Sequence, residues 1–361
     1  MDVERKPRRA PVLDLARPGG VAVEVHAAEA ADVLMSLFAI CSAKDDDTFD
    51  AGRSRLGEIR AAIAPDLLAA VEDLMQGNEK VPAHLLGLVW EMGAPRTLPR
   101  LVERIRELDA LEVHLQLLGH YAGHEGPVDA DTSLAAARGD EAAIARVADA
   151  LAEWPEACRP IERLLRLGSE RVKELVLAVL PRWYDEVYVP ASDGIGALLE
   201  RDAAAKQELA RTSTPEELTE VATHGYRYSP GPGIRRLVFF PGYWQRPWVL
   251  LNDFKHVKVF CYPLDLEESA EGPTPAELAR LYKALADEGR LRLLRRVASG
   301  PMTLLDAANE LGVAKSTAHH HLALLRHAGF VVMQDEGDEK LYSLRRDLLP
   351  QAGQLLQAYL G

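Results

Sequence analysis

The sequence predicts a mostly α-helical chain with small β elements. From Ala27 to about Leu209, apolar residues recur three and four positions apart, which is the spacing of amphipathic helices. Strand-like segments are confined to Val21–Val25 and to the region after Tyr226. Near the C-terminus, Leu311–Gly329 (LGVAKSTAHHHLALLRHAG) reads as a tight turn and then a helix with one apolar and one polar face. A length of 361 residues suits two or three domains.

The composition is that of a folded protein without a membrane segment. Hydrophobic residues make up 48% of the chain and charged residues 27%, which argues against a disordered chain. No apolar run approaches the roughly 20 residues needed to cross a bilayer. We expect residues 1–18 to be a mobile tail, because no apolar segment of the kind an export signal needs follows Arg8-Arg9. Three scattered cysteines without a CxxC pair fit the reducing cytoplasm.

Residues 19–264 are expected to form a helical domain closed by one small sheet. The first strand is Val21–Val25, and the turn cluster after Tyr226 leads into strands at Ile234–Phe240 and Val257–Tyr262. The acidic segment 265–273 then reads as a linker. Prolines are expected to separate the helices, at Pro65, Pro82, Pro95, Pro160 and Pro181.

Residues 274–361 are expected to form a winged helix-turn-helix. Thr274 opens a helix as a capping box, Asp287 caps a second, and a short third helix ends at Gly312. The helix after this turn is the one that such folds present to the major groove of DNA. The remaining elements are a hairpin of Val331–Met333 with Lys340–Leu344 and a last helix at about Leu348–Tyr359.

This order of elements, and the segments LADEGRLRLL, LGVAKSTAHHHLALLRHAGFV and KLYSL, resemble the ArsR-type winged helix-turn-helix repressors. The match runs from Thr274 to about Tyr359. The resemblance implies a homodimer, with the first and last helices of each module packed across the two-fold axis. It also implies a pseudo-palindromic operator in double-stranded DNA. The part ahead of it is similar to helical domains that precede such modules in high-GC actinobacterial regulators.

The distribution of charge along the chain favours DNA binding by the C-terminal module. The chain carries a net charge of −13, but residues 273–361 hold eleven Lys/Arg against ten Asp/Glu, so the first 272 residues carry −14. Between Glu310 and Asp335 there is no acidic side chain, while Lys315, Arg326 and four of the eleven histidines fall there. Local charge decides phosphate contact.

Helical geometry assigns the side chains of the reading helix to two faces. At about 100° per residue, Ala318, Leu322 and Leu325 point into the module, and a polar face points away from it. The alternative for that face is a merely solvated surface. His321 falls at the rim, where a packing role is favoured. We expect the DNA contacts to be made by Lys315, Ser316, Thr317, His319, His320 and Arg326.

Two positions depart from the pattern of the family. Ala314 stands where these modules carry a Ser-type N-cap, a loss of about 1 kcal/mol of helix stability. The wing tip, residues 335–339 (DEGDE), is acidic where relatives have arginines, so we expect it to stay away from phosphate.

We expect neither a metal nor a cofactor. The third and last helices lack the cysteine, histidine and acidic ligands through which many ArsR-type proteins sense metals. His120 and His124, with His114, are the remaining candidate, but a capped helix end explains them better. The run His319–His321 spreads over about 200° of a helix and cannot converge on one ion.

The predicted function is a cytoplasmic transcription regulator, expected to be a repressor, whose N-terminal domain senses a non-metal ligand or a partner. No motif for catalysis is present, so we do not expect an enzyme. The alternative is a protein-interaction adaptor whose winged helix no longer binds DNA specifically. A pocket for a small organic effector is one role for the aromatic and basic residues Arg235, Arg236, Tyr243, Trp244 and Trp248; the other is simple core packing.

Overall fold

The protein is described from a computed structural model that covers residues 20–42, 49–119, 128–152, 155–231, 233–265, 275–336, 339–346 and 348–360. Helices dominate it, and the predicted fold class is confirmed. The predicted tail, most of the predicted linker and Thr274 lie outside the described residues. The helices of the N-terminal part are α1 (Glu29–Ser42), α2 (Arg53–Ala62), α3 (Pro65–Met75), the 3-10 helix η1 (Val81–Leu85), α4 (Leu86–Glu91), α5 (Leu98–Glu107), α6 (Ala110–Leu118), α7 (Ala130–Ala137), α8 (Glu141–Ala150), α9 (Pro155–Leu167), α10 (Ser169–Trp183), the π-helix η3 (Tyr184–Tyr188), α11 (Val189–Ala191), α12 (Ile195–Ala210) and α13 (Pro215–Ala222).

Two of the five prolines do not separate helices, contrary to the prediction. Pro160 lies inside α9 and Pro181 lies inside α10. Each removes one N–H from its helix, and three residues after Pro181 the chain continues as the π-helix η3. Packing of the amphipathic faces therefore outweighs the local cost of proline here.

The predicted small sheet is present and has a fourth strand. Its strands are β1 (Ala22–Val25), β3 (Arg236–Gly242), β4 (Leu250–Phe254) and β5 (Val257–Pro263), in the order β1-β3-β5-β4. β1 and β5 run parallel to β3, whereas β4 is antiparallel to β5. The strand β4 was not predicted, because LLNDF lacks the alternation or the apolar run that identifies a strand.

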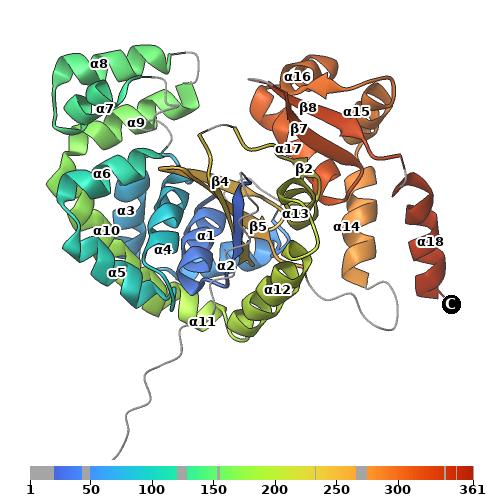
Figure 1. The fold of residues 1–361 in the computed structure, drawn as a ribbon, viewed down its shortest axis with the longest axis horizontal. Coiled ribbons are helices and arrows are strands. Elements are labelled where there is room, and N and C mark those ends of the chain that lie inside the picture. The colour runs from blue at the N-terminus through green and yellow to red at the C-terminus, as the bar shows by residue number, and fades with distance from the viewer. Residues whose placement is uncertain are drawn as a thin grey trace, which may run out of the picture.

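The two faces of this sheet belong to two different cores. Val238 and Phe240 of β3 pack into the core of the helical layer that contains α1. Leu237 and Phe239 pack into a second core, which also contains Phe330 of the C-terminal module. Strands that are buried on both faces read as continuous apolar runs, as β3 does. In Figure 1 the helical layer lies on one side of the sheet, and α12 and α13 lie between the sheet and the C-terminal module.

The C-terminal module has the predicted elements. Asp287 caps its second helix by accepting a hydrogen bond from the Arg290 N–H, and Gly312 ends the third helix in the left-handed region at φ 69°. The elements are α14 (Pro275–Leu285), α15 (Glu288–Ala298), β6 (Met302–Thr303), α16 (Leu304–Leu311), α17 (Lys315–His327), β7 (Val331–Glu336), β8 (Glu339–Leu344) and α18 (Leu348–Leu360).

The wing sheet contains one strand from the N-terminal part. β2 (Tyr226–Arg227) pairs in parallel with β7, so the sheet has the order β2-β7-β8-β6. The Met333 N–H also donates to the Gly225 carbonyl at 2.7 Å. The two parts of the chain therefore share a sheet as well as a hydrophobic core.

Candidate nucleic-acid interface

The helix-turn-helix is formed by α16 and α17. Thr303 and Asp306 make a capping box at the start of α16. After Gly312, the chain turns into α17 at Ala314, which has an extended backbone and no side-chain cap hydrogen bond. The structure therefore agrees with the sequence that α17 begins without a side-chain N-cap.

The apolar face of α17 lies where it was predicted. Ala318, Leu322 and Leu325 have no exposed surface and belong to the core of the module. His321 is half-buried at the rim, with its Nδ1 3.5 Å from an Asp287 carboxylate oxygen. Burial lowers the pKa of His321, which fits the packing role expected of it.

The polar face of α17 is divided into two halves. Lys315, Ser316 and Thr317 in the first turn are exposed. In the second half, Ala323 and His327 are buried, although they lie on the face turned away from the module core. The N-terminal part of the protein covers this second half.

Arg326 was predicted to contact DNA, but it is buried and bound within the protein. Only 5% of its surface is exposed, and its guanidinium donates to the carbonyl oxygen of Thr223, directly after α13. Burial lowers the pKa of Arg326 to about 10. In this arrangement Arg326 cannot reach a phosphate, because its fork is directed at the N-terminal part.

His327 makes a second contact between α17 and the N-terminal part of the chain. Its Nε2 lies 3.5 Å from an Asp50 carboxylate oxygen, and its ring meets the His224 ring edge-on at 5.1 Å. Burial lowers the pKa of His327 to about 4, against the opposing effect of the Asp50 carboxylate. The imidazole is therefore neutral at pH 7 in this arrangement.

Trp248 forms the third contact, with the middle of α17. Its ring stacks on the His319 ring at 5.7 Å and 23°, and tilts against the His320 ring at 5.9 Å. The His319 side chain is nevertheless exposed to solvent on its other side; partial desolvation and the charges of neighbouring lysines and Arg326 lower its pKa to about 4.

A set of buried polar contacts fixes the segment that carries Trp248. Asp32 of α1 accepts from the Tyr243 N–H at 2.6 Å and from the Tyr188 hydroxyl at 3.0 Å, and burial raises its pKa to about 6. The Gln245 amide donates to the Tyr262 carbonyl at 3.0 Å. Trp248 is thus held on a rigid support instead of a free loop.

The five residues predicted to line an effector pocket do not come together. Arg235 is exposed and Arg236 pairs with Glu24, both at the start of β3, whereas the other three follow its end. Seven residues of strand separate the two groups by roughly 20 Å. Trp244 is fully buried and packs in the core, as the alternative interpretation expected, and the Tyr243 hydroxyl accepts from Arg55.

The metal candidates remain without support in the described residues. His114 is buried, with Nδ1 3.1 Å from the Ser169 hydroxyl and Nε2 3.0 Å from the Leu164 carbonyl, so both nitrogens have partners. His120 and His124 lie outside the described residues. Within the part of the chain that the structure describes, no group of three or more His, Cys, Asp or Glu side chains is placed to hold a metal ion.

Sequence reasoning missed the residues that cover α17. Thr223, Asp50 and Trp248 lie on three segments, and Thr223 is separated from its partner by 103 positions. No local pattern indicates such a pairing. The side chains of the acidic wing tip, residues 335–339, lie outside the description. No described helix is long and apolar enough to span a membrane.

Comparison with known proteins gives matches in the C-terminal region. A family model described as a helix-turn-helix domain matches residues 285–334. NmtR of Mycobacterium tuberculosis, an HTH-type transcriptional regulator, is 34% identical over 82 residues, which are 23% of this chain and 63% of NmtR. The chain thus spans slightly less than two thirds of the length of NmtR.

Two further relatives agree. CmtR of Mycobacterium bovis, also an HTH-type transcriptional regulator, is 39% identical over 85 residues, which are 23% of this chain and 72% of CmtR. A cadmium resistance transcriptional regulatory protein CadC homolog of Staphylococcus aureus is 34% identical over 71 residues, 19% of this chain and 59% of the homolog. No solved structure matches the chain.

The fold and the position of α17 define the C-terminal module as a winged helix-turn-helix. The similarity to CmtR identifies the family of this module. The chain belongs to the ArsR family of helix-turn-helix transcription regulators.

Proposed function

We propose that the protein is a dimeric, cytoplasmic repressor that binds a pseudo-palindromic DNA operator through α17, and that its N-terminal part controls this binding. The observation that carries the proposal is the position of α17, whose first turn is exposed while its second half lies against the N-terminal part. DNA contact begins at Lys315, Ser316 and Thr317. His319, which is exposed but stacked on Trp248, and the half-buried His320 join when Trp248 moves away.

Release of α17 is part of the proposal, because Trp248 stacks on His319 and so covers part of the face that would enter the major groove. The docked arrangement, as described, has Arg326 on Thr223 and Trp248 on His319. DNA and the N-terminal part therefore compete for one face of the helix. Whatever stabilises docking lowers the apparent affinity for DNA.

Exposed apolar side chains support the dimer. Tyr282 of α14 is 36% exposed, and Leu356 and Tyr359 of α18 are 37% and 47% exposed. The two helices already touch within one chain, where the Tyr282 hydroxyl donates to the Ala352 carbonyl at 3.0 Å. We expect Leu356→Glu to produce monomers in light scattering, whereas Leu291→Glu, on α15 and 49% exposed, leaves the mass unchanged.

The experiment that tests the proposal is fluorescence anisotropy with DNA from upstream of the protein's own gene, at two salt concentrations and with a scrambled competitor. Specific binding should survive the competitor and weaken with salt, because phosphate contacts release counterions. Ser316→Ala combined with Thr317→Ala should weaken it, while the exposed Ser299→Ala at the end of α15 should not.

The covered half of α17 also favours a second function. If docking is permanent, the module is an interaction adaptor and not a DNA reader. Equal, weak binding of operator and scrambled DNA by both the wild type and a variant with weakened docking, Trp248→Ala, would support the adaptor. Specific binding by either would exclude it.

A further inference from the structure

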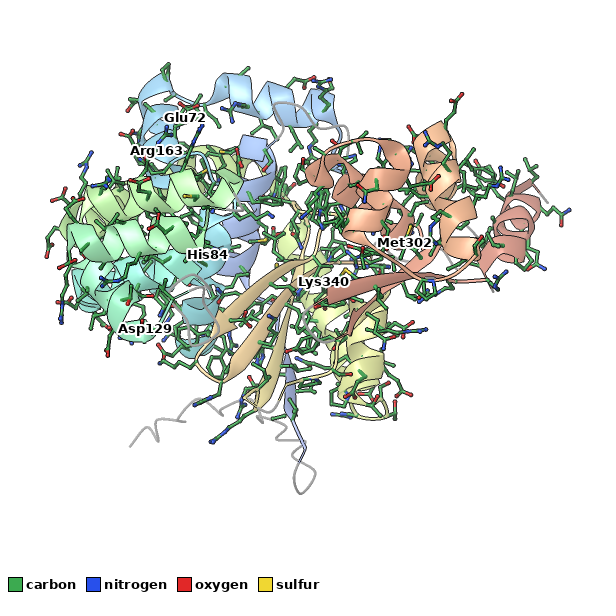
Figure 2. The ribbon with its side chains drawn as sticks, turned by 90° about the horizontal axis from the view of Figure 1, so that it is seen from above. Glu72, His84, Asp129, Arg163, Met302 and Lys340 are labelled. Atoms are coloured by element: carbon green, nitrogen blue, oxygen red, sulfur yellow. The ribbon has the colours of Figure 1, made fainter. Side chains whose placement is uncertain are left out.

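A cavity of about 430 Å³ lies between the N-terminal sheet and the reading helix. One wall comes from Trp248, Val249 and Leu251 at the start of β4, and the opposite wall from α17 and the start of α16. The wing closes the third side, and Figure 2 shows Lys340 on the part of the wing nearest the strands of the N-terminal sheet. Cavities of this size hold small organic molecules.

The lining combines aromatic surface with positive charge. Three aromatic residues line the cavity: Tyr226, Trp248 and Tyr342. Three cationic side chains line it as well: Lys315, Arg326 and Lys340. Among the described lining residues there is no carboxylate. Lys340 and Arg326, with Lys80 nearby, also help to lower the pKa of the His319 imidazole, as a locally positive potential should.

One polar atom of Trp248 has no partner among the described residues. The Trp248 indole Nε1 is buried and makes no hydrogen bond to any described residue. A buried indole N–H ordinarily donates to an acceptor. The Trp248 ring also lies against the His319 ring, so the wall offers a flat aromatic surface, while the indole N–H itself has no surface exposed to the cavity.

We propose that this cavity binds a small planar organic anion, such as an aromatic carboxylate or sulfonate. Its ring packs on Trp248 and the neighbouring tyrosines, and its acidic group lies near Lys315 and Lys340. This site replaces the effector pocket expected from sequence, with which it shares only Trp248.

The regulatory consequence rests on the proposed function, but the binding does not. Lys315 and His319 line the cavity and also belong to the face of α17 assigned to DNA. A ligand that touches both walls is bound by the docked arrangement alone, whereas DNA needs the released helix. The two therefore exclude each other, and ligand at ten times its dissociation constant should weaken DNA binding about tenfold.

A matched pair of fluorescent probes tests the site on the full-length protein without DNA. 1-Anilinonaphthalene-8-sulfonate carries the planar rings and an anionic group, and N-phenyl-1-naphthylamine carries the rings alone. We expect the anion to saturate one site per chain and the neutral probe to bind at least tenfold more weakly. Equal affinity of the two probes would overturn the assignment of an anion site.

Variants locate the binding. Lys340→Gln and Trp248→Phe should each weaken the anionic probe about fivefold or more, while Lys255→Gln, an exposed lysine at the far end of β4, should have no effect. Loss of affinity in all three variants, or in none, would contradict the site. Thermal unfolding of each variant separates loss of the site from loss of the fold.

A final arm adds the operator fragment. Displacement of the anionic probe by DNA supports exclusion, and simultaneous binding of both contradicts it. Should the protein bind no DNA at all, the proposed function fails, yet the probe titration and its variants still decide the binding site.

Discussion

The two halves of α17 differ in what they contact, although one helix and one sequence motif produce both. The first turn, with Lys315 and Ser316, is exposed and has no side-chain cap. The last turns, with Arg326 and His327, are as buried as core residues and are bound to the N-terminal part. A reading helix can therefore be complete in sequence and still present only half of its polar face to DNA.

The largest expected effect concerns the stability of the buried half. Arg326→Met removes a hydrogen bond from a charged donor and leaves the Thr223 carbonyl without it, so we expect a loss of about 1.5–3 kcal/mol in the free energy of unfolding. Lys315→Met, in the exposed half, should change it by less than about 0.5 kcal/mol. Urea denaturation of both variants measures the difference. Equal effects would mean that the two halves do not differ in solution.

The next effect concerns DNA affinity. Trp248→Ala removes two aromatic contacts with α17, of about 0.5–1.5 kcal/mol each, so docking weakens and operator affinity should rise about tenfold. Trp90→Ala, in the helical layer, should leave affinity unchanged. Anisotropy titrations give both numbers, and an unchanged affinity for Trp248→Ala would show that docking does not oppose DNA binding.

Acidification should weaken docking by a smaller amount. His327 faces Asp50, His224 and Arg280, and its pKa is about 4 when buried against a usual value of about 6.5. Because the docked state prefers the neutral ring, its contribution is complete above about pH 6.5 and is lost as the pH falls toward 4. Between pH 7.5 and 5.5 the free energy of unfolding should fall by about 1 kcal/mol from this group.

The control for this pH dependence is His327→Gln, which cannot titrate. Its stability should depend less on pH across the same interval than that of the wild type. A wild-type protein that becomes more stable on acidification would contradict the prediction. His319→Gln should also reduce the pH dependence of the free energy of unfolding, but by less than His327→Gln, because solvent reaches the His319 ring.

The smallest effect belongs to the exposed end of the helix. Ala314 has the extended backbone of an N-cap at φ −63° and ψ 152°, but no side chain that can accept a hydrogen bond. Ala314→Ser should therefore stabilise the protein by about 0.5–1 kcal/mol, as measured by urea denaturation. Ala279→Ser, inside α14 and exposed, should give no gain. If Ala314→Ser does not change the free energy of unfolding, the missing cap does not limit the stability of α17.

The C-terminal module could be predicted almost completely because its signals are local. Asp287 as a cap, Gly312 as a left-handed end and the apolar spacing of Ala318, Leu322 and Leu325 each depend on neighbouring residues only. The same holds for the strands β1, β3 and β5, which shifted by no more than two residues from their predicted bounds.

What could not be predicted depends on contacts between distant segments. Helical periodicity correctly assigned one face of α17 as polar, but it cannot tell whether that face meets water, DNA or another part of the chain. Arg326 was predicted to contact phosphate because arginine side chains commonly bind phosphate. Its guanidinium N–H groups can donate to a backbone carbonyl equally well, and here one donates to Thr223. The residues expected to form an effector pocket lie apart for a simpler reason: Arg236 is the first residue of β3 and Trp248 follows the end of that strand, so the strand separates them.

The pairing of β2 with β7 affects how the chain can be shortened to a fragment that contains the C-terminal module. A fragment that begins at Thr274 loses Tyr226 and Arg227, and thereby uncovers the backbone edge of β7 along Met333 and Gln334. Uncovered strand edges recruit other chains. A fragment that begins at Ser213, ahead of α13, keeps that edge covered, but without β1 and the helical layer it uncovers the edge of β3 and the sheet face that carries Val238 and Phe240. The smallest transplantable reader in this protein is therefore longer than its recognisable motif, and fusions designed on the motif alone should aggregate.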